Sequence, residues 1–104
     1  MVRSKQTLEQ QYSDLTPNSM AQWNKGRRFM PGGIIKGAYW QAPHPIYVST
    51  AKGCYVWDID NRKYTDFVNH HTALILGHNP PNVITALAQC IENGIVYGAP
   101  VQLE

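Results

Sequence analysis

The chain has 104 residues, enough for one small domain at most, and a chain of this size buries only about 60–70% of its unfolded surface. Hydrophobic residues make up 43%, and no apolar run approaches the roughly 20 residues of a membrane-spanning helix, so a soluble protein without membrane contact is expected. Nine Lys and Arg against seven Asp and Glu give a net charge of +2, too small to indicate nucleic-acid binding.

The N-terminal part predicts helix. Residues 1–16 contain no apolar segment of the length of a secretory signal, so we expect an N-terminal tail or short helix and a cytoplasmic location. Thr16 as N-cap and Pro17 at the first helical position predict a helix from Pro17 to about Phe29, ended by Pro31 and two glycines.

The central part predicts a small antiparallel sheet. Residues 34–48 combine glycine and prolines with aromatic residues, which favours an extended loop leading into an edge strand. From Gly53 the sequence GCYVWDID alternates with the two-residue period of a strand. Asp60 and Asn61 favour a tight turn, and a return strand is predicted over Tyr64–Val68.

The sequence LGHNPPN, residues 76–82, lies between this sheet and a second helix. Gly77 permits a sharp reversal, Asn79 is a candidate cap, and a proline is tolerated in the first helical turn. Apolar residues then recur at helical spacing over Pro81–Glu92, which predicts an amphipathic helix closed by Gly94. The fold class is therefore α+β: an N-terminal helix, a small antiparallel hairpin and a following helix.

Local chemistry in the chain is sparse. Adjacent residues of a regular strand point to opposite faces, so His70 and His71 do not favour a shared metal ion, and no metal site is expected. Cys54 and Cys90 are 36 positions apart without a second thiol near either, which favours two reduced, buried cysteines. No P-loop, dinucleotide fingerprint or hydrolase nucleophile motif is present, so no self-contained catalytic set emerges.

Several motifs occur in a specific order: MPGG, GCYVWDIDNRKYTDF, LILGHNPPNVITAL and GIVYGAPVQLE. In this order the chain resembles the N-terminal region of class III pyridoxal-phosphate aminotransferases, over roughly Trp23 to Glu104. The resemblance is greatest to the glutamate-1-semialdehyde aminomutase branch and the β-amino-acid transaminases. It implies a fold-type-I, homodimeric enzyme, in which residues 17–104 form the N-terminal segment of the small domain and the chain is incomplete, truncated before the cofactor-binding domain.

The resemblance also implies where substrate lies. Lys36 occupies a position at which the β-transaminase branch carries a carboxylate-binding arginine, and a point charge gives that contact less geometric definition. His71 stands where the family often places an aromatic residue near substrate. Tyr97, Gly98 and Ala99 lie in a segment that runs close to the active site and the partner subunit in the family. A structural role stays open for each of these candidates.

The cofactor residues of the family, including the lysine that forms the Schiff base, are expected downstream of Glu104, and no lysine of this chain matches it. No catalytic residue is therefore assigned in this chain. Two functions remain open. The first is a piece of an enzyme that moves an amino group on an amino acid or amino-aldehyde, by transamination or aminomutation, inactive and without stable pyridoxal phosphate on its own. The second is a truncated, non-enzymatic chain that acts as an interaction module with a full-length relative.

Overall fold

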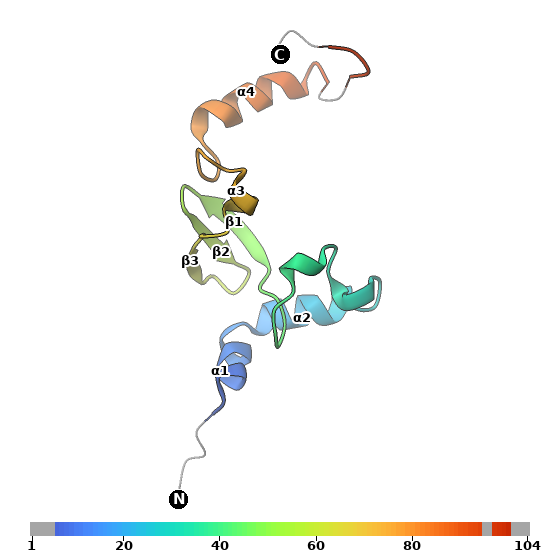
Figure 1. Cartoon of the computed structure of the whole chain (residues 1–104), viewed down its shortest axis with the longest axis vertical. Helices are drawn as coiled ribbons and strands as arrows, with labels where there is room; N and C mark the ends of the chain where they lie inside the picture. The colour runs from blue at the N-terminus through green and yellow to red at the C-terminus, as the bar shows by residue number, and fades with distance from the viewer. Residues whose placement is uncertain (1–5, 95–96, 101–104) are drawn as a thin grey trace, which may run out of the picture.

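A computed structural model describes residues 6–94 and 97–100 as an elongated chain with helices at both ends and a sheet between them (Figure 1). The expected α+β class, with an antiparallel sheet between helices, is confirmed. The elements in chain order are helices α1 (Leu8–Leu15) and α2 (Pro17–Gly26), the 3-10 turns η1 (Pro31–Gly33) and η2 (Gly37–Tyr39), strands β1 (Val48–Lys52), β2 (Tyr55–Asp58) and β3 (Lys63–Thr65), the turn α3 (Asn69–Thr72), and helix α4 (Pro81–Ile91).

Helix α1 begins with a capping box. The Thr7 hydroxyl accepts a hydrogen bond from the Gln10 backbone N–H at 3.2 Å, and the Gln10 side chain accepts one from the Thr7 N–H at 2.9 Å. Helix α2 ends at Gly26, three residues earlier than predicted. The chain turns back there and brings Gly33 close to Gly26, where a Cβ would overlap the Gly33 carbonyl oxygen, so the approach requires glycine.

The cap of helix α2 comes from the sheet and not from Thr16. The Thr16 hydroxyl donates to the Tyr12 carbonyl at 2.7 Å and makes no capping bond. Instead the Asp60 carboxylate, in the β2–β3 turn, accepts the backbone N–H groups of Asn18 at 2.8 Å and Ser19 at 3.0 Å. A negative group at the first turn also suits the helix dipole, so this carboxylate fastens α2 to the sheet.

The sheet has the order β1-β2-β3 and is antiparallel throughout, as the predicted hairpin required. The edge strand expected after the proline-rich loop is β1. The return strand is shorter than predicted, because β3 ends at Thr65. Phe67 and Val68 leave the sheet and are exposed by 91% and 64%, since the chain turns around the side chain of Asp66.

Among the described residues no large apolar side chain is buried. The buried polar side chains are Thr16, Ser19, His44 and Asp58, and Pro45 is buried beside His44 in the chain. Asp58 accepts the N–H groups of Asp60 and Arg62 and the Tyr64 hydroxyl, the last at 2.7 Å. Burial, followed by this bond, raises the pKa of Tyr64 to about 12. Asp58 therefore organises the β2–β3 hairpin, while the buried Ser19 of α2 accepts the Tyr47 N–H at 3.2 Å just before the sheet.

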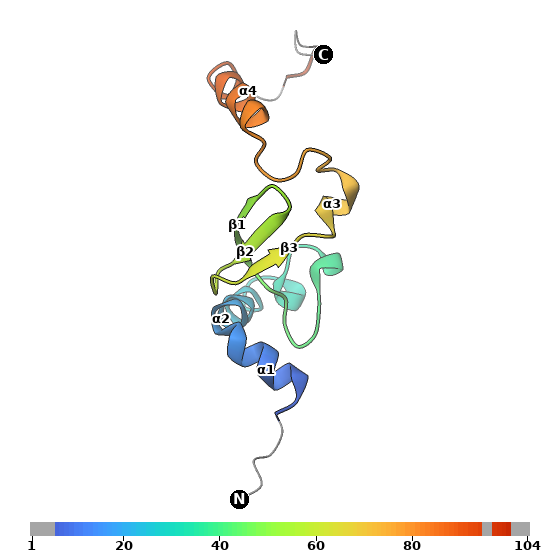
Figure 2. The same cartoon turned by 90° about the vertical axis from the view of Figure 1, so that its left-hand side faces the viewer.

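The overall shape follows from this lack of an apolar core. The radius of gyration is 18.6 Å, whereas a compact domain of this length has about 13 Å. Helix α4 lies apart from the sheet in both views (Figures 1 and 2). Its predicted apolar face is present but open, with Ile84, Leu87 and Ile91 exposed by 46%, 51% and 65%. No helix in the described part of the chain has both the length and the apolar character needed to cross a membrane.

Candidate functional site

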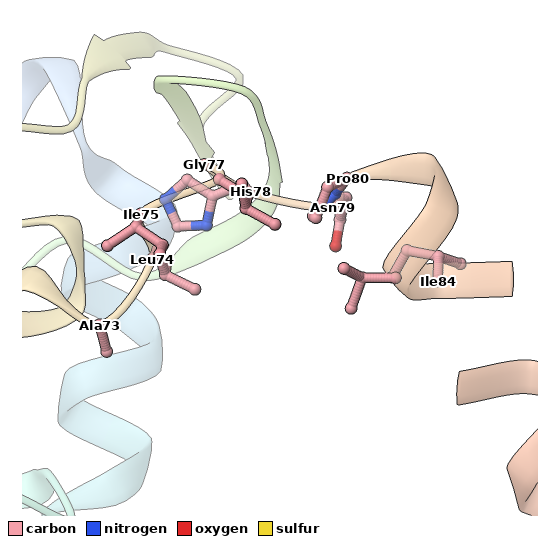
Figure 3. Close-up of a pocket in the computed structure, with 10 residues that line it drawn as sticks. Ala73, Leu74, Ile75, Gly77, His78, Asn79, Pro80 and Ile84 are labelled. Atoms are coloured by element: carbon pink, nitrogen blue, oxygen red, sulfur yellow. The ribbon is translucent and has the colours of Figure 1, made fainter. Parts of the chain in front are cut away.

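One hollow lies where residues 73–80 lead into helix α4 (Figure 3). Its volume is about 340 Å³. Leu74 and Ile84 face it from opposite sides, one from the loop and one from the helix (Figure 3). His78 and Asn79 supply its polar side chains. The hollow is open and mainly apolar, a surface that suits a packing partner at least as well as a small molecule.

A second hollow, of about 510 Å³, shares Leu74, Leu76, Gly77 and His78 with the first. The residues that line only this second hollow come from the β1–β2 turn and from the start of the loop after β3: Gly53, Cys54, Asp66, Phe67 and Asn69. The segment Leu74–His78 is therefore the wall between two hollows. Cys54 is exposed and not buried as predicted, because it lies in the turn at the open end of the sheet.

Gly77 and His78 hold this wall against the sheet. Gly77 has φ +74°, and a Cβ there would lie 2.8 Å from the Gly53 carbonyl oxygen, so the close approach requires glycine. His78 and Gly53 exchange two backbone hydrogen bonds of 2.8 and 2.9 Å, a bridge outside the three strands. The sharp reversal predicted at Gly77 is therefore present. Asn79 does not cap helix α4, since its amide donates to the Ala51 carbonyl at 2.7 Å.

Asp66 is the electrostatic centre of the loop. Its Oδ2 lies 2.7 Å from Nε2 of His78, and its Oδ1 accepts the backbone N–H groups of Val68 and Asn69, both at 2.9 Å. The Asn69 N–H and then the His78 side chain lower the pKa of Asp66 below its ordinary value, since both favour the charged carboxylate. One side chain therefore organises the start and the end of the loop.

The loop contains a left-handed turn in place of the regular strand assumed for His70 and His71. The φ angles of Asn69, His70, His71 and Thr72 are +48°, +47°, +56° and +72°. Such a conformation costs an L-residue roughly 1–2 kcal/mol, although Asn and His tolerate it better than most. The two imidazoles lie 6.3 Å apart between ring centroids. We expected His70 and His71 to lie in a regular strand, with side chains on opposite faces. That expectation was wrong, because β3 ends at Thr65, before both histidines.

The sequence-predicted substrate residues are dispersed over the chain. Lys36 is exposed, with Nζ 5.4 Å from the centre of the Tyr39 ring. His71 is exposed on the left-handed turn. The Tyr97 hydroxyl donates to the carbonyls of Asn93 and Gly94, the second at 2.8 Å.

Gly98 and Ala99 follow Tyr97 in an exposed segment, and a Cβ on Gly98 would meet nothing within 4 Å. Within residues 6–94 and 97–100 no hydrogen bond or ring contact joins Lys36, His71 and Tyr97. The described chain therefore leaves these three candidates separate, and their proximity to substrate stays a prediction.

The lining of the two hollows differs from the charged side chains that pyridoxal phosphate needs. Neither hollow is lined by a lysine or an arginine, so neither offers an amine for a Schiff base or a cation for the phosphate. Lys63, for example, lies over the rings of Tyr55 and Trp57, with Nζ 3.5 and 5.6 Å from their centres. Lys5 is outside the described residues. Groups of three metal-ligating side chains are also absent from the described part of the chain.

Sequence reasoning missed the role of two aspartates. Asp66 stands two and three residues before the N–H groups that it accepts, which is the spacing of an Asx-type turn and a usable local signal. Asp60 was assigned only to a turn. Its capping contacts reach residues 41 and 42 positions away, and no local pattern reports such a distance.

Comparison with known proteins agrees with this architecture. Residues 37–101 match the family Aminotransferase class-III. The glutamate-1-semialdehyde 2,1-aminomutase of Syntrophobacter fumaroxidans is 40% identical over 80 residues, which cover 74% of this chain and 18% of that protein. The β-phenylalanine aminotransferase of Variovorax paradoxus is 29% identical with a TM-score of 0.82, over 89% of this chain and 22% of that one. A glutamate-1-semialdehyde aminomutase from Pseudomonas aeruginosa PAO1, solved in complex with PMP, is 27% identical with a TM-score of 0.82, over 90% and 21%.

The helices and the small antiparallel sheet thus have the fold of one part of the pyridoxal-phosphate-dependent transferases. The chain belongs to the class III aminotransferase family, since the family match covers more than half of its residues. It spans about a fifth of the length of the curated relatives that it matches. The predicted resemblance is confirmed.

Proposed function

We propose that this chain is the N-terminal segment of an aminotransferase or aminomutase that moves an amino group on an amino-acid or semialdehyde substrate. The observation that carries the proposal is the family match over residues 37–101, together with a TM-score of 0.82 to a β-phenylalanine aminotransferase and to a glutamate-1-semialdehyde aminomutase. Residues 17–104 are the segment of the small domain. Pyridoxal phosphate, when bound, supplies the electron sink for the chemistry, and its binding residues are expected downstream of Glu104.

Within this proposal, five residues of the chain lie near substrate: Lys36, His71, Tyr97, Gly98 and Ala99. Their exposure supports this assignment, because the surface of each is open in the described chain to another part of the enzyme. Lys36 supplies a point charge to a substrate carboxylate, without the two parallel hydrogen bonds of an arginine. The imidazole of His71 offers a donor, an acceptor or a stacking surface.

The segment is proposed to be inactive by itself and to bind no pyridoxal phosphate stably. Two observations support this: the hollows lack lysine and arginine, and the described residues bury no large apolar side chain. Incubation of the 104-residue chain with pyridoxal phosphate, borohydride reduction and mass measurement should leave its mass unchanged. A covalent adduct at one lysine, blocked by substitution of that lysine, would refute this part of the proposal.

The partners proposed for the whole enzyme are a small amino-acid or amino-aldehyde substrate and a second identical subunit, in the cytoplasm. A second candidate function is an interaction module that pairs with a full-length relative through its apolar surface. The exposed apolar face of α4 favours this candidate, since Leu87 and Ile91 are exposed by 51% and 65%.

The intact mass of the native protein separates these two functions. An antibody against the hairpin of residues 53–68 would capture the protein from its own cells for mass spectrometry. A species several-fold heavier than 11.7 kDa, active in amino-group transfer, supports the enzyme. A stable species at 11.7 kDa that co-purifies with a full-length relative would refute catalysis by this chain and support the module.

A further inference from the structure

The left-handed turn at Asn69–Thr72 contains no glycine, although four successive positive φ angles of +47° to +72° are a conformation that glycine adopts most readily. Thr72 is the least suited of the four, because its branched Cβ crowds the backbone at positive φ. Side chains of this kind leave such a conformation unless surrounding contacts impose it. Contacts from outside the turn must therefore hold it.

The hydrogen bonds at the exit of the turn are too long to hold it, and at its entry the backbone contributes one bond of 2.9 Å, from the His71 N–H to the Val68 carbonyl. The Ala73 N–H reaches the His70 carbonyl at 3.4 Å, and the Leu74 N–H reaches the Asn69 carbonyl at 3.4 Å. The bonds from Val68 and Asn69 to the Asp66 carboxylate are 2.9 Å, and bonds to a charged acceptor are the stronger class. The entry of the turn is therefore fastened by Asp66.

The same carboxylate is fastened to the sheet through His78. Nε2 of His78 lies 2.7 Å from Asp66 Oδ2, while the backbone of His78 is bridged to Gly53 in the β1–β2 turn. The side chains of His78 and Asp66 are exposed by only 20% and 14%, so water competes little with this contact. The loop is thus closed at both ends by one carboxylate–imidazole contact anchored on the sheet.

We propose that Asp66 and His78 are positioning residues that hold the turn Asn69–Thr72 in its left-handed conformation and thereby fix the place of His71. We call these contacts the clamp: the Asp66 carboxylate accepts the N–H groups of Val68 and Asn69 and contacts the imidazole of His78. Its consequence for the reaction rests on the proposed function, in which His71 lies near substrate. The clamp itself is a property of the fold and is testable without any substrate.

Amide hydrogen exchange of the native protein, read by mass spectrometry on peptides that span residues 66–74, measures the clamp directly. Asp66→Ala removes all three contacts and should speed exchange in these peptides by on the order of tenfold or more. His78→Leu should also speed amide exchange in these peptides. His78→Gln keeps an N–H donor at similar reach, so it should retain most of the protection. The matched control is Asp14→Ala, because Asp14 is an exposed carboxylate bonded only to the Gln6 side chain in the described chain.

A suppressor variant separates positioning from a merely structural role. Thr72→Gly removes the branched side chain at the largest φ of the turn, so it should restore protection when combined with Asp66→Ala. In the active protein, Asp66→Ala should raise KM, and the double variant Asp66→Ala with Thr72→Gly should return KM toward the native value. A purely structural loss at Asp66 would not be repaired by a glycine six residues away.

The proposal is overturned if Asp66→Ala leaves exchange over residues 66–74 unchanged, or if His78→Gln is as damaging as His78→Leu. It is also overturned if Thr72→Gly repairs nothing. Since exchange is measured without substrate, these results stand apart from the proposed function, which fails separately if the native protein transfers no amino group.

Discussion

Asp60 offers the sharpest test of how this fold holds together without an apolar core. Its carboxylate caps helix α2 by accepting the N–H groups of Asn18 and Ser19 at 2.8 and 3.0 Å, from a position 41 to 42 residues along the chain. Asp60→Ala removes both bonds and the favourable charge at the helix N-terminus. Asp60→Asn keeps one oxygen acceptor without the charge, so it should show a smaller effect.

The size of the effect follows from these contacts. Loss of an N-cap side chain costs about 1 kcal/mol, within a range of about 0.5–2 kcal/mol, and loss of the charge at the helix dipole adds roughly 0.3–1 kcal/mol. Asp60→Ala should therefore destabilise α2 by about 1–2 kcal/mol, which corresponds to roughly 5- to 30-fold faster amide exchange in peptides covering residues 17–26. Asp60→Asn should give about half of that free energy.

The dependence on pH gives an independent check. Burial alone would raise the pKa of Asp60, but the N–H groups of Asn18 and Ser19 outweigh it and hold the pKa below its ordinary 3.8. The cap is therefore fully present above the unfolded pKa and is lost as pH falls through the folded one. The native protein should lose protection of α2 below about pH 4, whereas Asp60→Asn should be insensitive there.

Two results would refute this reasoning. The first is unchanged exchange of α2 in Asp60→Ala. The second is an equal effect from Asp14→Asn, which alters an exposed carboxylate at the end of α1 that caps no helix in the described chain. Either outcome would mean that α2 is held by other contacts, such as the bond of 3.2 Å from the Tyr47 N–H to the Ser19 hydroxyl.

Two further predictions concern the sheet and the loop that packs on it. Gly77→Ala should weaken the bridge to Gly53 by about 1 kcal/mol or more, because the new Cβ would lie 2.8 Å from the Gly53 carbonyl oxygen, at a residue with φ +74°. Amide hydrogen exchange of the peptide that contains Gly53 measures this loss. The control is Gly37→Ala, which should be neutral because the space around Gly37 is open. Tyr64 should titrate near pH 12 in ultraviolet absorbance, and Asp58→Asn should bring that value toward 10. The pKa of Tyr64 is higher in the folded than in the unfolded chain, so its contribution to stability is complete below pH 10 and is lost as pH rises through about 12. An unchanged Tyr64 titration in Asp58→Asn would contradict this account.

The sequence by itself determined the elements whose signals are local. Alternation from Tyr55 to Asp58 predicted a strand, because successive side chains of a strand face opposite sides. Helical spacing and a proline in the first turn predicted α4, and its observed range of Pro81–Ile91 differs by one residue from the expected end. Motif order determined the family, which the match over residues 37–101 confirms.

Only the tertiary structure decided what joins these elements. The carboxylate of Asp60 caps a helix 41 to 42 residues away, His78 reaches Asp66 across 12 residues, and Gly53 pairs with His78 across 25 positions. Each of these contacts depends on chain segments folded back on one another, so no pattern within a short window encodes it. The left-handed turn at Asn69–Thr72 belongs to the same group, because its residues favour other conformations until Asp66 and His78 close the loop around them.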